Sequence, residues 1–401
     1  MPKLLSCFVN GNEGQRDHVE HILPDKILIK VLSKLSAEQV WKCRMVCKRW
    51  FRLISDPYFA NKLLYLERSP SIVLGQYLLG YKPNAFFYLD NNNNGRNRNK
   101  KTELRKWFAH YHQPTLVASC NGLLLFESSR NYFIGNPITK EIVNLVKPIK
   151  SFVRVCGFYF HSSTKEYKLL YVQCEGVIDY YSVISIGSVR GDLRDYNHDV
   201  PSPEGSKPVA VKNILYWKAD DKFSPPCQHT ITGFDTNNEE FFTLPHPSCN
   251  AIIKACKSRS RTIHGLMHLL EMEGRLTCWF LGLLFGFVYV LDDDENYRGT
   301  RNWTLMHKFN LKQDFKDYPL FKINGVRLDH DIKLLSIQNK ELLLVWFYRG
   351  VFRYNIVTRT VRKLKGFKNK QRDDVFLTSY TKSVVSLKDL YPDLYSKYKR
   401  S

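Results

Sequence analysis

The sequence is 401 residues long, is 44% hydrophobic and carries a formal net charge of +22 at pH 7. A chain of this length can bury a large core, and one small domain followed by one large domain fits it well. The ten cysteines are scattered, and Met1–Gln15 has no charged segment followed by a long apolar core. This pattern argues against a secreted disulfide scaffold and predicts reduced thiols in the cytoplasm or nucleus. The charge favours an acidic partner, which could be nucleic acid or an acidic protein.

A short helical module follows a polar leader at residues 1–20. Its predicted range is residues 21–64, where a first apolar stripe at helical spacing comprises Ile27, Leu28, Val31, Leu32 and Leu35. A second stripe comprises Val40, Cys43, Cys47 and Trp50. Asp56–Pro57 ends a third, shorter segment. These spacings predict a small all-α domain.

This module has more apolar side chains than inward-facing positions. About forty residues can bury only a modest core, yet further apolar side chains stand at Ile22, Leu23, Ile29, Trp41, Met45, Val46, Phe51 and Ile54. Each contributes roughly 1.5–3 kcal/mol if it is fully buried. We therefore expect several of them to be covered, either by the chain's own second domain or by a partner protein.

The next segment, residues 65–114, has poor periodicity. It contains the polar, basic, low-complexity run "NNNNGRNRNKK" at Asn91–Lys101, which is typical of a flexible loop. We predict a linker over residues 65–114, a large β domain over residues 115–390 and a basic tail over residues 391–401. The aromatic content of 14% supports the β assignment, because aromatic side chains pack well on a pleated sheet.

A recurring phrase in the β region indicates a repeated hairpin. In "NPITKEIVNL", Asn136 is followed at regular offsets by Thr139, Ile142 and Leu145, and the same offsets recur from Asp235, Asn355 and, more loosely, His161. The Asn or Asp side chain can hydrogen-bond its own backbone in a turn, after which a second strand leaves in fixed register. Repeated hairpins in an all-β chain predict a β-propeller, but the uneven spacing does not give the number of blades.

The uncharged segment Leu276–Leu291 could be mistaken for a membrane span. It is shorter than a spanning helix requires and is interrupted by Gly282 and Gly286. Its aromatic and β-branched residues favour two buried strands with a tight connection. No membrane association is expected.

No catalytic or metal-binding constellation is complete. Cys43 and Cys47 stand four residues apart without a second pair, which favours core cysteines over zinc ligands. His264 and His268 lack the glutamate of a zinc protease motif, and their surroundings are strand-like. The sequence therefore predicts a protein that needs no cofactor and has no chemistry of its own.

Three basic runs remain, at residues 254–261, 359–372 and 397–400. Such runs are most often solvated surface. They are also compatible with a patch for an acidic substrate, a nuclear-import segment or phosphate contacts with nucleic acid.

The helical module resembles an F-box. The matching positions are Leu23, Pro24, Ile27, Leu28, Val31, Leu32, Leu35, Val40, Arg44, Val46, Cys47, Lys48, Trp50, Leu53 and Ile54. Lys30 and Ser36 depart from the pattern, where an acidic residue and a proline are common. The resemblance implies binding to a Skp-type adaptor, and through it to cullin and RING subunits. The adaptor-binding residues that it implies are Leu23, Pro24, Ile27, Leu28, Val31, Leu32, Leu35, Val40, Arg44, Val46, Leu53 and Ile54.

The β region resembles the F-box associated domain of plant proteins, which is related to kelch propellers. The order of several segments carries this resemblance, among them "ASCNGLLLF", "ITGFDTNNEEFFTLPHP" and "VFRYNIVTRTVRKLKG". Together the two resemblances imply a non-catalytic substrate receptor of a Skp–cullin–F-box (SCF) ubiquitin ligase, with an unknown protein substrate. The alternative is a basic protein that binds nucleic acid or chromatin.

Overall fold

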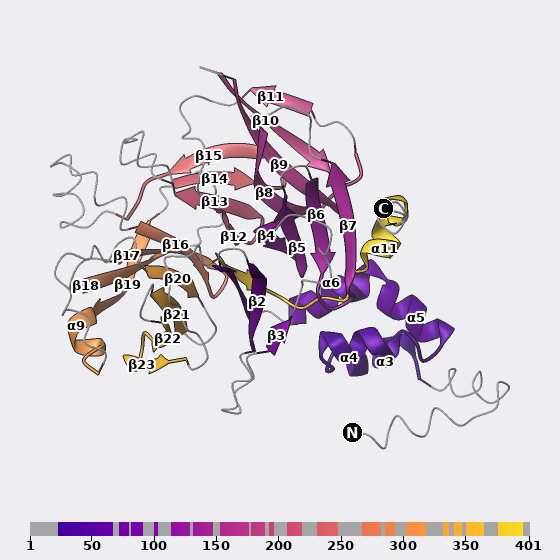
Figure 1. Ribbon diagram of the computed structural model, residues 1–401, viewed down its shortest axis with the longest axis horizontal. Helices are drawn as coiled ribbons and strands as arrows, with labels where there is room; N and C mark the ends of the chain where they lie inside the picture. Colours follow the sequence, from indigo (N-terminus) through magenta and orange to yellow (C-terminus); the bar gives the residue numbers. More distant parts are fainter. Residues whose placement is uncertain are drawn as a thin grey trace.

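The structure is a computed structural model of the whole chain. The residues that it describes are 23–66, 72–79, 82–90, 100–102, 114–128, 131–146, 153–175, 178–188, 192–195, 207–218, 231–247, 267–281, 285–292, 302–317, 332–336, 341–346, 350–364 and 376–395. In this part of the chain, helices come first and strands follow (Figure 1). The predicted order of a small all-α domain and a large all-β domain is confirmed.

The helical domain comprises α3 (Asp25–Leu32), α4 (Ala37–Cys43), α5 (Lys48–Ser55) and α6 (Pro57–Leu66). The first two helices begin at recognisable signals. Pro24 directly precedes α3, a position at which a backbone N–H would have no acceptor within the helix, so proline loses no hydrogen bond there. Ser36 forms a capping box with Gln39 at the start of α4. Ser36, which departs from the F-box pattern, therefore stabilises the helix that it precedes.

The strands form six four-stranded antiparallel sheets among the described residues. The first three sheets in chain order are β1 (Ile72–Leu79), β2 (Lys82–Asp90) and β3 (Lys100–Thr102), with β24 (Phe376–Tyr380); β4 (Thr115–Cys120), β5 (Leu123–Glu127), β6 (Asn131–Asn136) and β7 (Glu141–Val146); and β8 (Val153–His161), β9 (Glu166–Glu175), β10 (Ile178–Ser185) and β11 (Asp192–Asp195).

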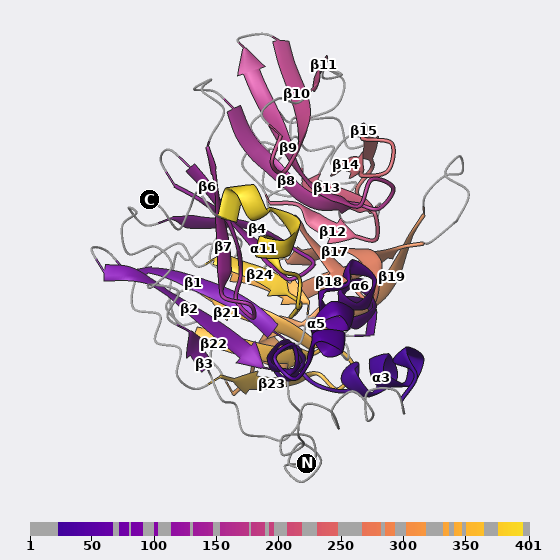
Figure 2. The same ribbon diagram turned by 90° about the vertical axis from the view of Figure 1, so that its right-hand side faces the viewer.

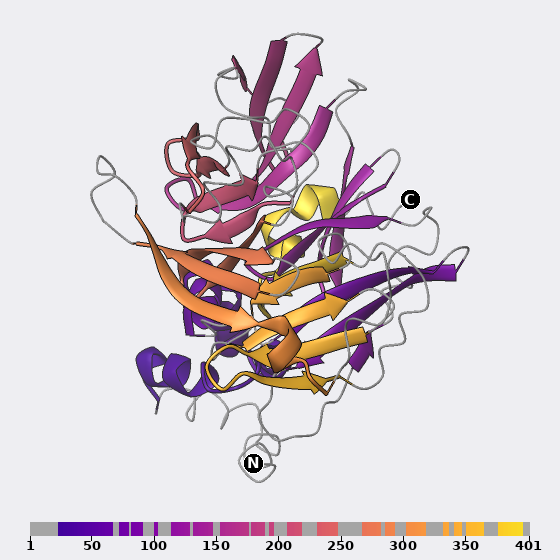
Figure 3. The same cartoon turned by 90° about the vertical axis from the view of Figure 1, so that its left-hand side faces the viewer.

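The other three are β12 (Val209–Val211), β13 (Ile214–Lys218), β14 (Ile231–Asp235) and β15 (Glu240–Leu244); β16 (Met267–Met272), β17 (Arg275–Leu281), β18 (Phe285–Leu291) and β19 (Trp303–Asn310); and β20 (Ile332–Ser336), β21 (Glu341–Trp346), β22 (Gly350–Asn355) and β23 (Thr360–Lys363). The short helix α9 (Leu311–Asp314) follows β19, and α11 (Leu387–Leu390) follows β24. Figure 3 shows the two orange sheets, β16–β19 and β20–β23, from the side opposite to Figure 2.

The sheets are arranged in a ring as the blades of a β-propeller. Strand β4 contacts β8, β12 contacts β16, β16 contacts β20, β20 contacts β24, and β24 contacts β4. Between β8 and β12 the two blades share a buried cluster that includes Tyr159, Leu215 and Trp217. The predicted propeller is confirmed.

The ring is closed by strands from the two ends of the domain. Strand β24 pairs with β1 in a register that sets Ile72 opposite Tyr380. The prediction of a linker over residues 65–114 is therefore corrected, because β1, β2 and β3 lie in this range and complete a blade. Such pairing joins positions about 300 residues apart and leaves no local pattern in the sequence. Residues 91–99 of the low-complexity run lie outside the described residues.

The repeated hairpins are confirmed. The phrases that begin at Asn136, Asp235 and Asn355 join the third and fourth strands of their blades, in β6–β7, β14–β15 and β22–β23. In each, the side-chain oxygen accepts a hydrogen bond from the backbone N–H two residues on, at 2.8–3.0 Å. The looser copy at His161 instead joins the first and second strands, β8 and β9.

The segment Leu276–Leu291 forms strands of one blade, as predicted. Strands β17 and β18 pair directly, with Trp279 opposite Val288. Among the described residues, no helix is long and apolar enough to cross a membrane.

The helical domain packs directly against the propeller. One continuous core contains Leu28, Leu32 and Val40 of the helices together with Leu123 and Tyr132 of the β4–β7 blade. Of the surplus apolar side chains, Ile54 is buried in this shared core and Ile29 and Trp41 pack against it, whereas Leu23, Met45, Val46 and Phe51 are exposed. Figures 1 and 2 show the helices beside this blade and α11.

Candidate functional site

The entry into helix α3 is held in place by helix α5. The guanidinium of Arg49 donates hydrogen bonds to the Leu23 carbonyl at 2.6 Å and to the Asp25 carboxylate at 2.9 Å. The N–H groups of Ile27 and Leu28 donate to the Pro24 carbonyl. Leu23 and Pro24 therefore have a fixed position at the start of the domain.

Helix α3 has two apolar faces. Leu28 and Leu32 are buried, at 3% and 0% exposure, and pack in the core shared with the propeller. Leu23, Ile27 and Val31 are 41%, 47% and 51% exposed; Ile27 and Val31 lie one turn apart on the helix, and Leu23 stands just before its start. The single stripe predicted from the sequence therefore divides into a covered face and an uncovered one.

The turn between α4 and α5 exposes further apolar surface. Met45 is 84% exposed, Val46 39% and Phe51 46%. These three residues were recognised only as surplus apolar side chains or as F-box matches, and Tyr58, 66% exposed, gave no signal in the sequence. These residues add exposed apolar surface to the helical domain.

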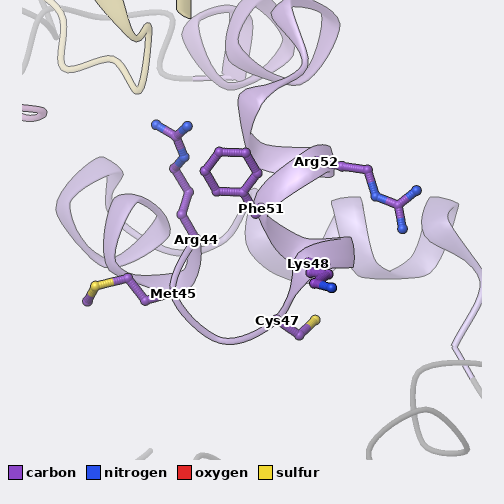
Figure 4. Close-up of a pocket in the computed structure, with 6 residues that line it drawn as sticks. All are labelled: Arg44, Met45, Cys47, Lys48, Phe51 and Arg52. Atoms are coloured by element: carbon purple, nitrogen blue, oxygen red, sulfur yellow. The ribbon is translucent and has the colours of Figure 1, made fainter. Parts of the chain in front are cut away.

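A hollow of about 530 Å³ lies at this turn. Figure 4 shows its lining side chains, which are Arg44, Met45, Cys47, Lys48, Phe51 and Arg52. The lining combines cationic and apolar side chains and contains no carboxylate. This chemistry suits a partner segment that carries both apolar and acidic residues.

Arg44 lies at the inner wall of the hollow. Its guanidinium carbon is 4.2 Å from the ring centroid of Trp41 and 4.5 Å from that of Phe51. Its Nη2 donates to Asp389 Oδ2 at 2.8 Å, while its Nε is buried and has no hydrogen-bond partner. Arg44 is thus held by the chain's own C-terminal segment.

The twelve predicted adaptor-binding residues fall into three groups. The exposed ones are Leu23, Pro24, Ile27, Val31 and Val46. Leu35 and Leu53 are half-buried and pack against the core. The buried ones are Leu28, Leu32, Val40, Arg44 and Ile54. In the free chain, packing or the Asp389 ion pair covers this last group. Contact of the twelve residues with an adaptor stays a prediction.

Exposed apolar residues are concentrated on the helical domain. Among the described residues, seven of the ten exposed large hydrophobic side chains lie between Leu23 and Tyr58. The other three are Leu305 and Val357 on the propeller and Leu390 of α11. A surface with this distribution favours docking through the helices.

The propeller carries a buried ionic cluster that is structural. Glu239 Oε1 accepts from Lys168 Nζ at 2.8 Å and from the Tyr159 hydroxyl at 2.9 Å, and Oε2 accepts from Arg194 Nη2 at 3.0 Å. Burial acts to raise the pKa of Glu239, but these hydrogen bonds and positive charges outweigh it and hold the pKa below its usual value. Each partner comes from β8–β11 and Glu239 from the β14–β15 turn, so the cluster joins two blades.

The candidate metal ligands of the sequence are only partly described. Within the described ranges, no group of three or more His, Cys, Asp or Glu side chains is arranged to hold a metal ion. Cys43 is buried, as predicted for a core cysteine, and burial raises its pKa. His268 lies on β16, where burial lowers its pKa to about 4; His264 lies outside the described residues.

The basic runs are only partly described. Arg359, Arg362 and Lys363 are exposed at the β22–β23 hairpin. The runs at residues 254–261 and 397–400, and residues 365–372 of the run at 359–372, lie outside the described residues.

Two family models match the chain. Residues 21–64 match the F-box-like family, and residues 79–388 match the F-box associated beta propeller domain. The second match begins inside the range predicted to be a linker, in agreement with the strands found there.

Similar proteins occur in Arabidopsis thaliana. A putative F-box protein is 25% identical over 71% of this chain and 73% of its own length, and F-box protein DOR is 23% identical over 87% of this chain and 89% of its own. Among solved structures, the β-propeller domain of Cps50 (Swd1) from Myceliophteria thermophila aligns with a TM-score of 0.38 at 10% identity, over 75% of this chain and 84% of that domain. The chain belongs to the plant-type F-box proteins with a C-terminal F-box associated β-propeller domain.

Proposed function

We propose that this protein is the substrate-recognition subunit of an SCF-type ubiquitin ligase. It binds a Skp-type adaptor through the uncovered face of the F-box, and through the adaptor it joins cullin and RING subunits. The propeller binds a protein substrate. The receptor itself is non-catalytic: it holds a substrate lysine near the ubiquitin-charged enzyme, so its contribution is proximity.

One observation carries the proposal. The F-box has a covered face, which packs on the propeller, and an uncovered face on which Leu23, Ile27 and Val31 leave about half of each side chain in solvent. An exposed group of apolar side chains of this kind marks a candidate binding surface. The hollow at the α4–α5 turn, lined in part by Lys48 and Arg52, adds positive charge to the helical domain.

Binding to a purified Skp-type adaptor at low and high salt tests the proposal. Because the contact is mainly apolar, we expect micromolar or tighter affinity that changes little with ionic strength. Duplex DNA and RNA are the comparators, since binding to phosphates falls steeply as salt increases. Absence of adaptor binding, together with tight, salt-sensitive binding of nucleic acid, would overturn the proposal in favour of a nucleic-acid-binding protein.

The proposal also assigns a place of action. Cytoplasm or nucleus is proposed, because the ligase subunits and reduced cysteines belong to these compartments. Fractionation of cells that express the tagged chain checks this assignment.

A further inference from the structure

The C-terminal segment, residues 381–391, lies between the F-box and the propeller. Ser383, Val384 and Leu387 are at most 2% exposed, although they come from the end of the domain. Val384 and Leu387 belong to the core that contains Leu28 and Leu32 of helix α3. Figure 2 shows α11 beside β7, above helices α5 and α6.

The propeller holds this segment through buried hydrogen bonds. Asn136 Nδ2 donates to the carbonyls of Ser383 at 3.1 Å and Val385 at 2.8 Å. The Glu141 carboxylate accepts from the Leu387 N–H at 2.7 Å and from the Ser386 hydroxyl at 3.2 Å. Asn136 and Glu141 are themselves buried. Breaking such a bond leaves a buried polar group unpaired, which opposes release of the segment.

The repeated hairpin thus has an additional role in this one blade. Asn136 makes its turn contact through Oδ1, which leaves Nδ2 free to bind the C-terminal segment. The β4–β5 turn of the same blade also fits closely: a Cβ at Gly122, whose φ is 77°, would lie 2.7 Å from the Thr381 carbonyl oxygen. The path of the segment is therefore fixed by both turns.

The F-box is attached to the same segment at two points. Lys382 Nζ lies 2.7 Å from Glu38 Oε1 on helix α4, and Asp389 Oδ2 lies 2.8 Å from Arg44 Nη2 at the end of that helix. Two attachments separated along one helix resist rotation as well as separation. The apolar core between them excludes the adaptor from this face and leaves the face of Ile27 and Val31 uncovered.

We propose that residues 381–391 form a clasp that fixes the orientation of the F-box on the propeller. Glu38, Arg44, Lys382 and Asp389 are then positioning residues for ubiquitin transfer, because they set where the substrate-binding domain stands relative to the adaptor. A freely turning propeller would present its lysines over a wide volume, and a fixed one presents them in a narrow zone. The role in ubiquitin transfer rests on the proposed function, whereas the clasp itself does not.

Charge exchange across the Glu38–Lys382 pair tests the clasp in the free chain. Glu38→Lys and Lys382→Glu each place like charges together, and we expect hydrogen exchange in α4 to accelerate roughly tenfold in each, by the repulsion typical of mismatched charges. The double variant restores the attraction and should return to the wild-type rate. Lys388→Ala, a change of an exposed side chain on the same segment, is the control and should leave the rate unchanged. Equal rates in all variants, or no rescue by the double exchange, would overturn the clasp.

Ubiquitin transfer separates positioning from simple stabilisation. In a ligase reconstituted with adaptor, cullin, RING subunit and charged E2, mass spectrometry maps ubiquitin on the receptor's own lysines. We expect a restricted set of sites for wild type and for the double exchange, and a broadened set for each single variant, at unchanged adaptor affinity. An unchanged set of sites in the single variants would refute the positioning role. Failure of the wild type to bind the adaptor would refute the proposed function, while the exchange experiment would still decide the clasp.

Discussion

Truncation of the exposed apolar side chains on and just before α3 should weaken adaptor binding by a predictable amount. Leu23, Ile27 and Val31 are 41%, 47% and 51% exposed, so an adaptor can bury about half of each side chain. Full burial of such a side chain contributes about 1.5–3 kcal/mol, and half of it roughly 1 kcal/mol. The triple alanine variant should therefore lose roughly 3 kcal/mol, which is about 100-fold in affinity.

Isothermal titration calorimetry with the adaptor measures this loss. The matched control is Leu305→Ala with Val357→Ala, because these propeller residues are 49% and 63% exposed and lie away from the F-box. The control should bind like wild type, and both variants should keep the wild-type melting temperature within a few degrees, since the changed side chains are half in solvent. A triple variant that binds within threefold of wild type would refute the reasoning.

Three further predictions concern the propeller. A fragment of residues 67–401 should unfold in one transition when followed by circular dichroism. A fragment of residues 105–401 lacks β1–β3 and leaves β24 unpaired, so its transition should be broad. Equal cooperativity of the two fragments would count against ring closure. Gly286→Ala should destabilise by about 1–3 kcal/mol in urea unfolding, because the new Cβ would clash with the ring of Phe309, which is 1% exposed. The added Phe309→Ala change should then cost much less than it does alone, and full additivity would exclude this clash. Burial lowers the pKa of His268 from 6.5 to about 4. As the pH falls from 6.5 toward 4, the unfolded chain therefore takes up a proton that the folded chain does not, and the free energy of unfolding declines. His268→Gln should reduce this decline in unfolding experiments at pH 7 and pH 5, and an equal decline in variant and wild type would contradict the prediction.

Local patterns in the sequence predicted much of this fold. The helical stripe around Leu28 and Leu32 predicted α3, because side chains three and four residues apart share a helix face. The Asn136, Asp235 and Asn355 phrases predicted hairpins, because the turn contact forms within two residues. Each signal comes from a physical interaction that is short-range along the chain.

Long-range contacts could not be predicted in the same way. The pairing of Ile72 with Tyr380 depends on ring closure, and the ion pair of Arg44 with Asp389 joins positions 345 residues apart. Arg44 therefore looked like a surface residue of the F-box. The division of α3 into a covered and an uncovered face was equally hidden, because Ile27 and Leu28 are both apolar and only the docked propeller distinguishes them.

Assembly of the receptor with adaptor and cullin tests the central claim most directly. The measurement is size-exclusion chromatography with light scattering on the full chain, its Val31→Asp variant and its Val357→Asp control. Wild type and Val357→Asp should each form a stoichiometric ternary complex at micromolar concentration, while Val31→Asp should remain outside it, because a carboxylate cannot be buried unpaired in an apolar contact. Absence of the complex with wild type, or equal assembly of Val31→Asp and Val357→Asp, would contradict a receptor that docks through the uncovered face of its F-box.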